Sequence, residues 1–407
     1  MTITEPADPL PRWNVADVHE SFGSRSFSDA KERSIADVER LIALFDELNI
    51  RATDQRTLTD VDGTAADRAI IEFNRVSDDL DLLDAYVYAT VSTDSRNAEA
   101  QSLMSEIDVV GAAMRPLLAR LAEWVKSLGA DDLAAVSTEA RDHIGPLSRF
   151  AERATHQMSE SEEHLYAELS TTGSGAWGRL QSDVTSQLTA EVDLPDGPAT
   201  LPMPAVRGLA TDADPSVRRA AYDAELAAWP RVEVPVAAAM NAIKGDANVI
   251  NRRRNWTSPL DASLFGNSVS RATFEAMQSA VTTSLPDFRR WMQVKAQLHG
   301  HAPERGLPWW DLVAPLPVAA GDVSWDQGLA IVRNAFGEFS PGLGGLVDRA
   351  VNEQWIDAEP RDGKQGGAFC MPFGGDRSLV MLNWSGSAES AQTTAHELGH
   401  AYHNTTL

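Results

Sequence analysis

One motif near the C-terminus constrains this chain more than any other feature: H-E-x-x-H, formed by His396, Glu397 and His400. Side chains four positions apart on a helix share one face and lie about 5–6 Å apart. Both histidines can therefore direct a ring nitrogen at one zinc ion, which accepts imidazole nitrogens at about 2.0–2.1 Å. Glu397 lies between them and can take a proton from a water at the open position of the metal. The motif predicts a helix and indicates the chemistry of a zinc metallopeptidase.

The composition is ordinary for a globular protein, but its charge balance is strongly acidic. The 407 residues include 35 basic and 59 acidic side chains, for a net charge of −24. The electrostatic field of a protein with this negative charge repels phosphate groups, so neither nucleic acid nor an anionic membrane is expected as a partner. The single cysteine, Cys370, excludes an internal disulfide and suits a reducing cytoplasm. Residues 1–15 lack signal-peptide features and no apolar run is long enough to span a membrane, so we expect a cytoplasmic protein. The oligomeric state is left open.

Apolar residues that recur every three or four positions predict a mostly α-helical chain. The first predicted helix opens at Asp29 and Glu32, which have capping-box spacing. A later helical segment contains Pro116, which is expected to kink it. The helical pattern covers residues 35–48, 66–91, 97–128, 214–251, 271–299 and 325–339.

Residues 191–204 interrupt this helical pattern. Their sequence, EVDLPDGPATLPMP, places a Pro-Asp-Gly turn between two short β-prone pieces, which indicates a hairpin or a loop. Asp214 and Pro215 then have the residue types of an N-cap and a first helical position. We place a boundary here, between an N-terminal helical domain at residues 1–190 and a catalytic domain at residues 205–407.

A second β-like region directly precedes the motif. Residues 366–370 and 378–383 are two short runs with strand character, and the turn sequence Phe-Gly-Gly-Asp lies between them. This pattern predicts a hairpin. The metal helix follows at once, with Ser385 or Ser387 as its candidate N-cap. Gly399 in that helix is expected to let another backbone segment pass close by, and the alternative is that a glycine is simply tolerated there.

Several segments resemble the oligoendopeptidase F branch of the thimet oligopeptidase-like zinc metallopeptidases. The strongest resemblance lies in WIDAEPRDGKQGGAFC and LVMLNWSGSAESAQTTAHELGHAYHN, which match the order of glycine-rich strand, second strand and metal helix in that family. Further similarity lies in NAIKG, NRRR, PLDASLF and LPWWDL, so the resemblance covers nearly the whole chain. The metal helix is its one highly specific motif.

The resemblance implies a fold and a substrate class. The fold is mostly α, an elongated helical zincin-type metallopeptidase with a cleft and a small β-hairpin beside the metal helix. The cofactor is one Zn²⁺ per chain, held by His396 and His400, and the substrates are oligopeptides. The family's glycine-rich strand pairs with the substrate backbone. It matches Gly366, Gly367, Ala368 and Phe369.

The third zinc ligand departs from the family pattern. In the family it is a glutamate on a following helix, whereas this sequence ends at Leu407, seven residues after His400. The resemblance therefore predicts a C-terminally truncated member whose last helices are missing. His403, one turn beyond His400, is a candidate substitute ligand, although a position in the second shell or at the surface is favoured.

Two functions follow from these residues. The first is a zinc-dependent metalloendopeptidase that hydrolyses internal bonds of short oligopeptides, with Glu397 as general base. The alternative is a catalytically inactive helical remnant, or a peptide-binding protein, that lacks the third zinc ligand. An incomplete ligand set would hold zinc weakly, because the number of ligands sets the affinity.

Overall fold

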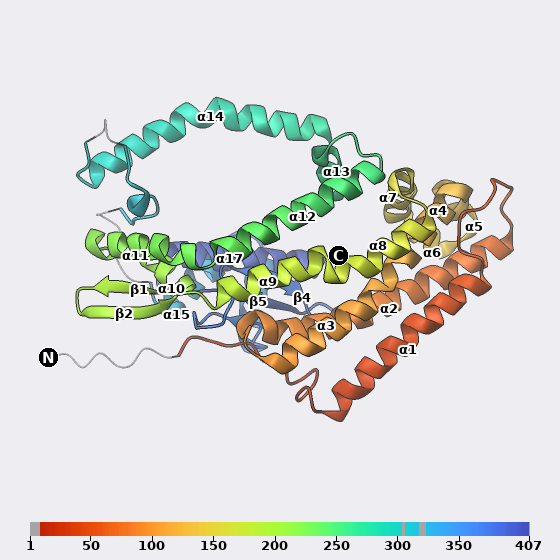
Figure 1. Cartoon of the computed structure of the whole chain (residues 1–407), viewed down its shortest axis with the longest axis horizontal. Coiled ribbons are helices and arrows are strands. Elements are labelled where there is room, and N and C mark those ends of the chain that lie inside the picture. Colours follow the sequence, from red (N-terminus) through yellow and green to blue (C-terminus); the bar gives the residue numbers. More distant parts are fainter. Residues whose placement is uncertain (1–8, 303–305, 317–322, 407) are drawn as a thin grey trace.

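The computed structural model describes residues 9–302, 306–316 and 323–406. Helices dominate this part of the chain, and many of them run along the long axis of an elongated molecule (Figure 1). The two small sheets contain two and three strands. None of the described helices is long and apolar enough to cross a bilayer. The predicted mostly α, elongated fold is confirmed.

Nine helices come before the first strand in the described chain. The first, α1, begins four residues before Asp29, because Ser24 caps it by accepting a hydrogen bond from the Phe27 N–H. The predicted capping box at Asp29 and Glu32 is therefore wrong. The helices are α1 Arg25–Glu47, α2 Asp60–Thr93, α3 Ala98–Ala112, α4 Met114–Leu128, α5 Ala130–Val136, α6 Thr138–Asp142, α7 Ile144–Arg153, α8 Glu160–Thr172 and α9 Ser174–Ser186.

The segment around Pro116 differs from the predicted kinked helix. The chain forms two helices, α3 and α4, which meet at Ala113. Pro116 lies in the first turn of α4, where a helix has no use for the backbone N–H that proline lacks. The proline is therefore accommodated at a helix start. Behind it, α4 packs against α7 and α8 and buries Leu121 and Val125 in the core of this region.

The interruption predicted near residue 191 is a β-hairpin. Strands β1 Thr189–Leu194 and β2 Gly197–Pro202 pair antiparallel, and Gly197 supplies the positive φ of +118° that the tight turn needs. Helix α11 begins at Pro215 behind an Asp214 cap, as predicted, but ends at Ala228, where a 3₁₀ turn separates it from the next helix. The helices that follow are α10 Met203–Gly208, α11 Pro215–Ala228, α12 Glu233–Arg253, α13 Pro259–Gly266 and α14 Arg271–Leu298.

The C-terminal part builds a small mixed sheet. Its strands are β3 Ile356–Asp357, β4 Phe369–Pro372 and β5 Ser378–Met381, in the order β3-β5-β4. The predicted hairpin is β4 with β5, which pair antiparallel. Helices α15 Trp325–Phe339, α16 Pro341–Asn352 and α17 Ala388–Asn404 accompany the sheet. Trp355, Val380, Leu398 and Ala401 meet in the core between them.

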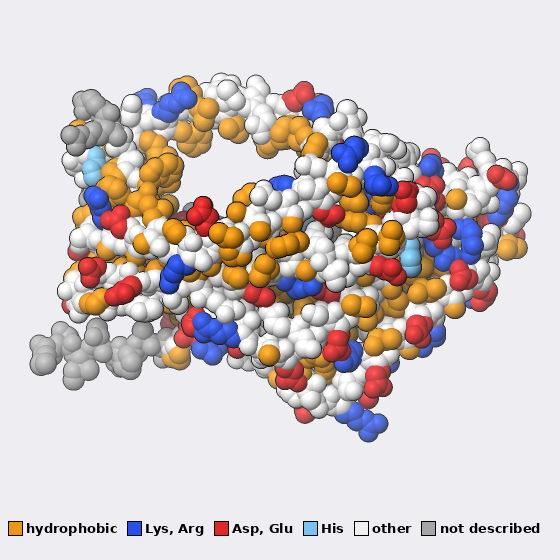
Figure 2. Space-filling model, viewed as in Figure 1, with side chains coloured by type: hydrophobic (Ala, Val, Ile, Leu, Met, Phe, Trp, Pro, Cys, Tyr) orange, Lys and Arg blue, Asp and Glu red, His pale blue; other side chains and the backbone are white. Residues whose placement is uncertain are grey.

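Helix α14 is set apart from most of the other helices. Figure 1 shows it as an arch, and Figure 2 shows an opening between α14 and α12, with hydrophobic side chains along its rim. Only Lys295 and Ala296 of α14 are buried, both near its C-terminal end. The exposed apolar residues recur every three or four positions and so form one stripe, Met277, Val281, Leu285, Phe288, Trp291, Val294 and Leu298.

The core around the sheet provides a stability test. Trp355 is fully buried, whereas Trp309 is 74% exposed. We expect Trp355→Ala to lower the free energy of unfolding by about 3–5 kcal/mol, because it leaves a large cavity. Trp309→Ala is the matched control and should change it by less than about 0.5 kcal/mol. Urea unfolding followed by circular dichroism measures both, and equal effects would contradict the described core.

Candidate active site

Helix α17 carries the H-E-x-x-H motif, and its packing determines which way the motif faces. The helix begins after Ser387, whose Oγ accepts a hydrogen bond from the Ser390 N–H at 3.1 Å. Leu398 and Ala401 are fully buried against the sheet and α15. Because these apolar side chains fix the rotation of α17, His396 and His400 emerge at the surface of the body.

The two imidazoles of the motif point toward one another. The His396 Nε2 and His400 Nε2 atoms are 3.2 Å apart, and the ring planes are nearly perpendicular. Two nitrogens bound at 2.0–2.1 Å to a tetrahedral metal would lie about 3.3–3.4 Å apart. The observed separation therefore fits two ligands of one zinc ion. It also allows an N–H···N hydrogen bond between neutral imidazoles.

Glu397 is largely buried, with 6% of its surface exposed. Burial raises the pKa of its carboxyl group, and the neighbouring His396 and His400 partly oppose that effect. Its oxygens accept no hydrogen bond from any described residue, so both are available to a water. A partly desolvated carboxylate next to two imidazoles is suited to accept a proton.

A third protein ligand is not found in residues 9–302, 306–316 and 323–406. No group of three His, Cys, Asp or Glu side chains in these ranges could hold a metal ion. His403 is exposed, and it does not form such a group with His396 and His400. The candidate metal site in this part of the chain therefore consists of two imidazoles.

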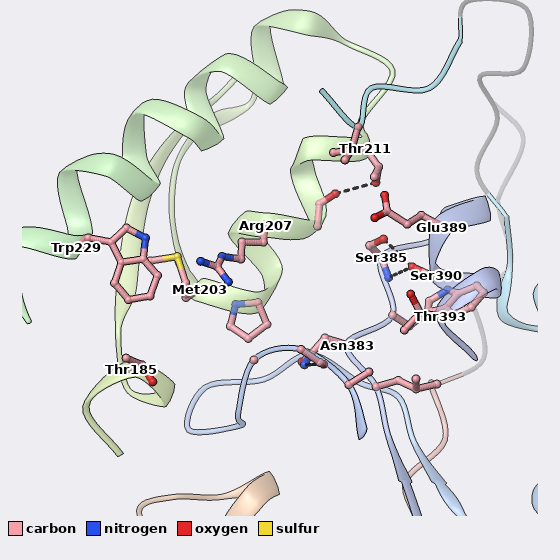
Figure 3. Close-up of a pocket in the computed structure, with 18 of the residues that line it drawn as sticks. Thr185, Met203, Arg207, Thr211, Trp229, Asn383, Ser385, Glu389, Ser390 and Thr393 are labelled. Carbon is pink, nitrogen blue, oxygen red and sulfur yellow. Dashed lines mark hydrogen bonds between the residues drawn. The ribbon is translucent and has the colours of Figure 1, made fainter. Parts of the chain in front are cut away.

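A cavity of about 600 Å³ lies beside the start of α17. Gly366, Gly367 and Ala368 form part of its wall, whereas Phe369 is not among the lining residues. The motif residues do not line the cavity either, but Thr393 lies three positions before His396 and four before Glu397, on the same helix face. The labelled residues in Figure 3 are Thr185, Met203, Arg207, Thr211, Trp229, Asn383, Ser385, Glu389, Ser390 and Thr393.

The glycine segment enters the cavity wall as a loop rather than as a strand. The predicted strand at residues 366–370 is shorter, since β4 begins at Phe369. Gly367 has a φ of +87°, which a side chain would strain and which interrupts regular pairing. Asn383 fixes this conformation, because its Nδ2 donates to the carbonyl oxygens of Gln365 and Gly367, each at 2.9 Å. β4 itself forms an edge of the sheet, so one of its sides has no strand partner among the described residues.

A buried ammonium anchors the loop that leads into the glycine segment. The Lys364 Nζ donates to the Asp357 Oδ1 at 2.6 Å and to the Leu382 carbonyl oxygen at 2.6 Å. Arg361 also pairs with both carboxylate oxygens of Asp357, at 2.7 and 2.9 Å. Burial lowers the pKa of Lys364 to about 8, against the opposing effect of Asp357. No pattern in the sequence predicts this network, because its members come from β3, a loop and the end of β5.

Gly399 does not have the predicted role. A Cβ atom built at this position would meet nothing within 4 Å among the described residues. No backbone segment in the described chain therefore requires a glycine there.

Comparison with known proteins finds one group of related peptidases. The model of peptidase family M3 matches residues 345–406, which contain the motif, and the oligopeptidase F model matches residues 126–189. These matches support an oligoendopeptidase F-like peptidase of family M3. It is 23% identical to the group B oligopeptidase PepB of Streptococcus agalactiae and 22% identical to an oligoendopeptidase F homolog of Lactococcus lactis. These alignments cover 83% and 78% of this chain, and 57% and 54% of the relatives.

Solved structures of related peptidases have the same fold as this chain. PZ peptidase A, determined with an inhibitor, superposes with a TM-score of 0.70 at 12% identity over 91% of this chain and 62% of that one. Oligoendopeptidase F from Enterococcus faecium gives a TM-score of 0.63 at 14% identity, over 81% and 66% of the two chains. The chain therefore spans only part of the length of the proteins it matches.

Zinc binding tests the paired imidazoles. We expect His396→Ala and His400→Ala each to weaken zinc affinity by more than about 100-fold. Loss of a residue that only hydrogen-bonds to a zinc ligand costs roughly 10–100-fold, and loss of a ligand itself should cost more. His403→Ala is the control on the same helix and should leave the affinity nearly unchanged. Titration against a competing chelator measures all three. A large loss in His403→Ala would instead make this residue the third ligand.

The loop anchor can be tested separately. Lys364→Met leaves buried carbonyl oxygens without a donor, so it should lower the free energy of unfolding by about 1–3 kcal/mol. Lys244 is exposed and makes no ion pair with a described residue, so Lys244→Met is the matched control. Urea denaturation compares the two, and an unchanged midpoint for Lys364→Met would rule out the anchoring role.

Proposed function

We propose that this chain is a zinc-dependent metalloendopeptidase that hydrolyses internal peptide bonds of short oligopeptides. The observation that carries the proposal is the geometry of α17. Its two imidazole nitrogens lie 3.2 Å apart, and a buried carboxylate stands between them in the sequence. The adjoining cavity has about the volume of a typical small-ligand site, so it suits a short peptide better than a folded protein.

Each residue of the motif has a separate task. His396 and His400 would hold the metal through their Nε2 atoms. Zinc, when bound, supplies an acidified water and polarises the carbonyl group of the scissile bond. Glu397 takes the proton from that water and then passes it to the nitrogen of the leaving amine, so that proton transfer balances over the reaction. Its buried position favours this use, because burial makes the carboxylate a stronger base.

The substrate backbone would lie along the glycine segment and the open edge of β4. An extended peptide can add to such an edge as an extra strand, with main-chain hydrogen bonds that do not depend on its sequence. Gly366, Gly367 and Ala368 leave room for a close approach, because two of them lack a side chain. Phe369 begins the strand and would contribute its backbone groups.

The proposed organisation has two domains. Residues 1–190 form an N-terminal helical domain and residues 205–407 form the catalytic domain, with the hairpin β1–β2 near the boundary. The single cysteine supports a cytoplasmic location. Oligopeptides are the proposed partners, and the acidic net charge argues against nucleic acid.

Replacement of the proposed base tests the mechanism. We expect Glu397→Gln to retain zinc and to lower turnover of an internally quenched oligopeptide by about 10²–10⁴-fold. Glu338→Gln, on an exposed position of α15, is the control and should leave turnover unchanged. Undiminished turnover in Glu397→Gln would exclude Glu397 as the base. Peptide binding without any turnover by the zinc-loaded parent chain would instead support the alternative of a peptide-binding protein.

A further inference from the structure

A second cavity lies at the C-terminal end of α12, and residues of α4, α8 and α13 line it together with residues of α12. Its volume is about 340 Å³, and it shares no lining residue with the cavity beside α17. The lining residues are unusually rich in positive charge for a chain whose net charge is −24. They include Arg115, Arg153, His156, Gln157, Glu163, Tyr166, Arg254 and Trp256.

Only one of the three arginines in this cavity has a carboxylate partner. Glu163 accepts hydrogen bonds from the Arg254 Nε and Nη2 at 3.0 and 2.6 Å, so these two charges compensate each other. Neither Arg115 nor Arg153 forms an ion pair with any residue that the structure describes. Arg115 donates only to the Ser170 hydroxyl, which is neutral. The cavity wall therefore holds two exposed guanidinium groups that have no ion-pair partner among the described residues, although Asp108 lies near Arg115 and Glu163 near Arg153.

The polar groups around these arginines are incompletely satisfied. The Gln157 Oε1 is buried and has no hydrogen-bond partner in the described chain. This oxygen accepts hydrogen bonds, so its partner would be a water or a hydroxyl or N–H group of a ligand rather than an oxyanion. Partial burial and the nearby Arg254 lower the pKa of Arg153, whereas Glu163 opposes that effect. A bound anion would favour the charged form of the Arg153 guanidinium in the same way.

The opposite part of the wall is flat and aromatic. The His156 and Trp256 rings stack with centroids 3.6 Å apart and planes within 9° of parallel. Phe265 packs beyond the indole at 5.3 Å. The cavity thus combines a charged side with an apolar side, which is the usual composition of a small-molecule site.

We propose that this cavity binds a small molecule through a phosphate or carboxylate group held by Arg115 and Arg153. Guanidinium groups match the planar geometry of such oxyanions and bind them through paired hydrogen bonds. The neighbouring arginines offer a contrast, since Arg253 and Arg254 are already paired with Glu162 and Glu163. The site is independent of the metal helix, so it would bind its ligand whether or not the motif is active.

Calorimetric titration with inorganic phosphate tests this site on the 407-residue chain, at constant ionic strength and neutral pH. We expect saturable binding, and a loss of at least about tenfold in affinity in Arg115→Gln and in Arg153→Gln, because each removes a charged hydrogen-bond donor. Arg153→Lys keeps the positive charge but loses the paired N–H donors of the guanidinium group. Its phosphate affinity should therefore lie between those of the parent chain and Arg153→Gln. Arg290→Gln on α14 is the matched control, since Arg290 is exposed and has no carboxylate partner among the described residues.

A second titration with citrate distinguishes the two ligand chemistries. Tighter binding of phosphate would indicate a phosphate ester as the ligand, and tighter binding of citrate would indicate a carboxylate. Absence of saturable binding of both anions up to about 10 mM would overturn the proposal. The proposal would also be overturned if Arg115→Gln and Arg153→Gln bound the anions with the affinity of the parent chain. Circular dichroism would verify that both variants are folded.

Discussion

The candidate active site depends on the burial of one face of α17. Leu398 and Ala401 have no exposed surface, and they lock the helix against the sheet and α15. A helix rotates by about 100° per residue, so a shift of one position would turn both imidazoles away from the surface they now reach. Apolar packing therefore determines which way His396 and His400 face, and their spacing of four residues on the helix lets their Nε2 atoms lie 3.2 Å apart. The orientation of the polar side chains of the motif thus depends on the buried hydrophobic face of α17.

The cavity beside the motif depends on polar contacts instead. Lys364 links the loop before the glycine segment to Asp357 and to the carbonyl of Leu382, and Asn383 holds the backbone of Gly367. Such buried groups carry a large desolvation cost, which is met only if their partners are all in place. The glycine segment is thus positioned by a network with little tolerance for change. This accounts for a loop that is well placed although it lies outside the regular strand.

Charge is distributed unevenly over this molecule. The net charge of −24 describes the average surface, yet the cavity at α12 contains two arginines without a carboxylate partner in the described chain. Short-range contacts with a guanidinium can outweigh a long-range field that salt screens within about 10 Å. Net charge therefore guides the expectation about broad classes of partner, but it does not describe individual sites.

The sequence by itself determined the helical character, the hairpins near residues 191 and 370, and the helix that carries the motif, since each depends on local spacing and turn chemistry. It also indicated the resemblance to the oligoendopeptidase F branch, through the motif and its flanking segments. It placed the start of α1 wrongly, because the serine cap five residues before Asp29 starts the helix ahead of the Asp29 and Glu32 pattern. The Lys364 network, the loop form of Gly367 and the arginine cavity were decided only by the tertiary structure. Their members lie far apart in the chain, and periodicity carries no information about which distant side chains meet.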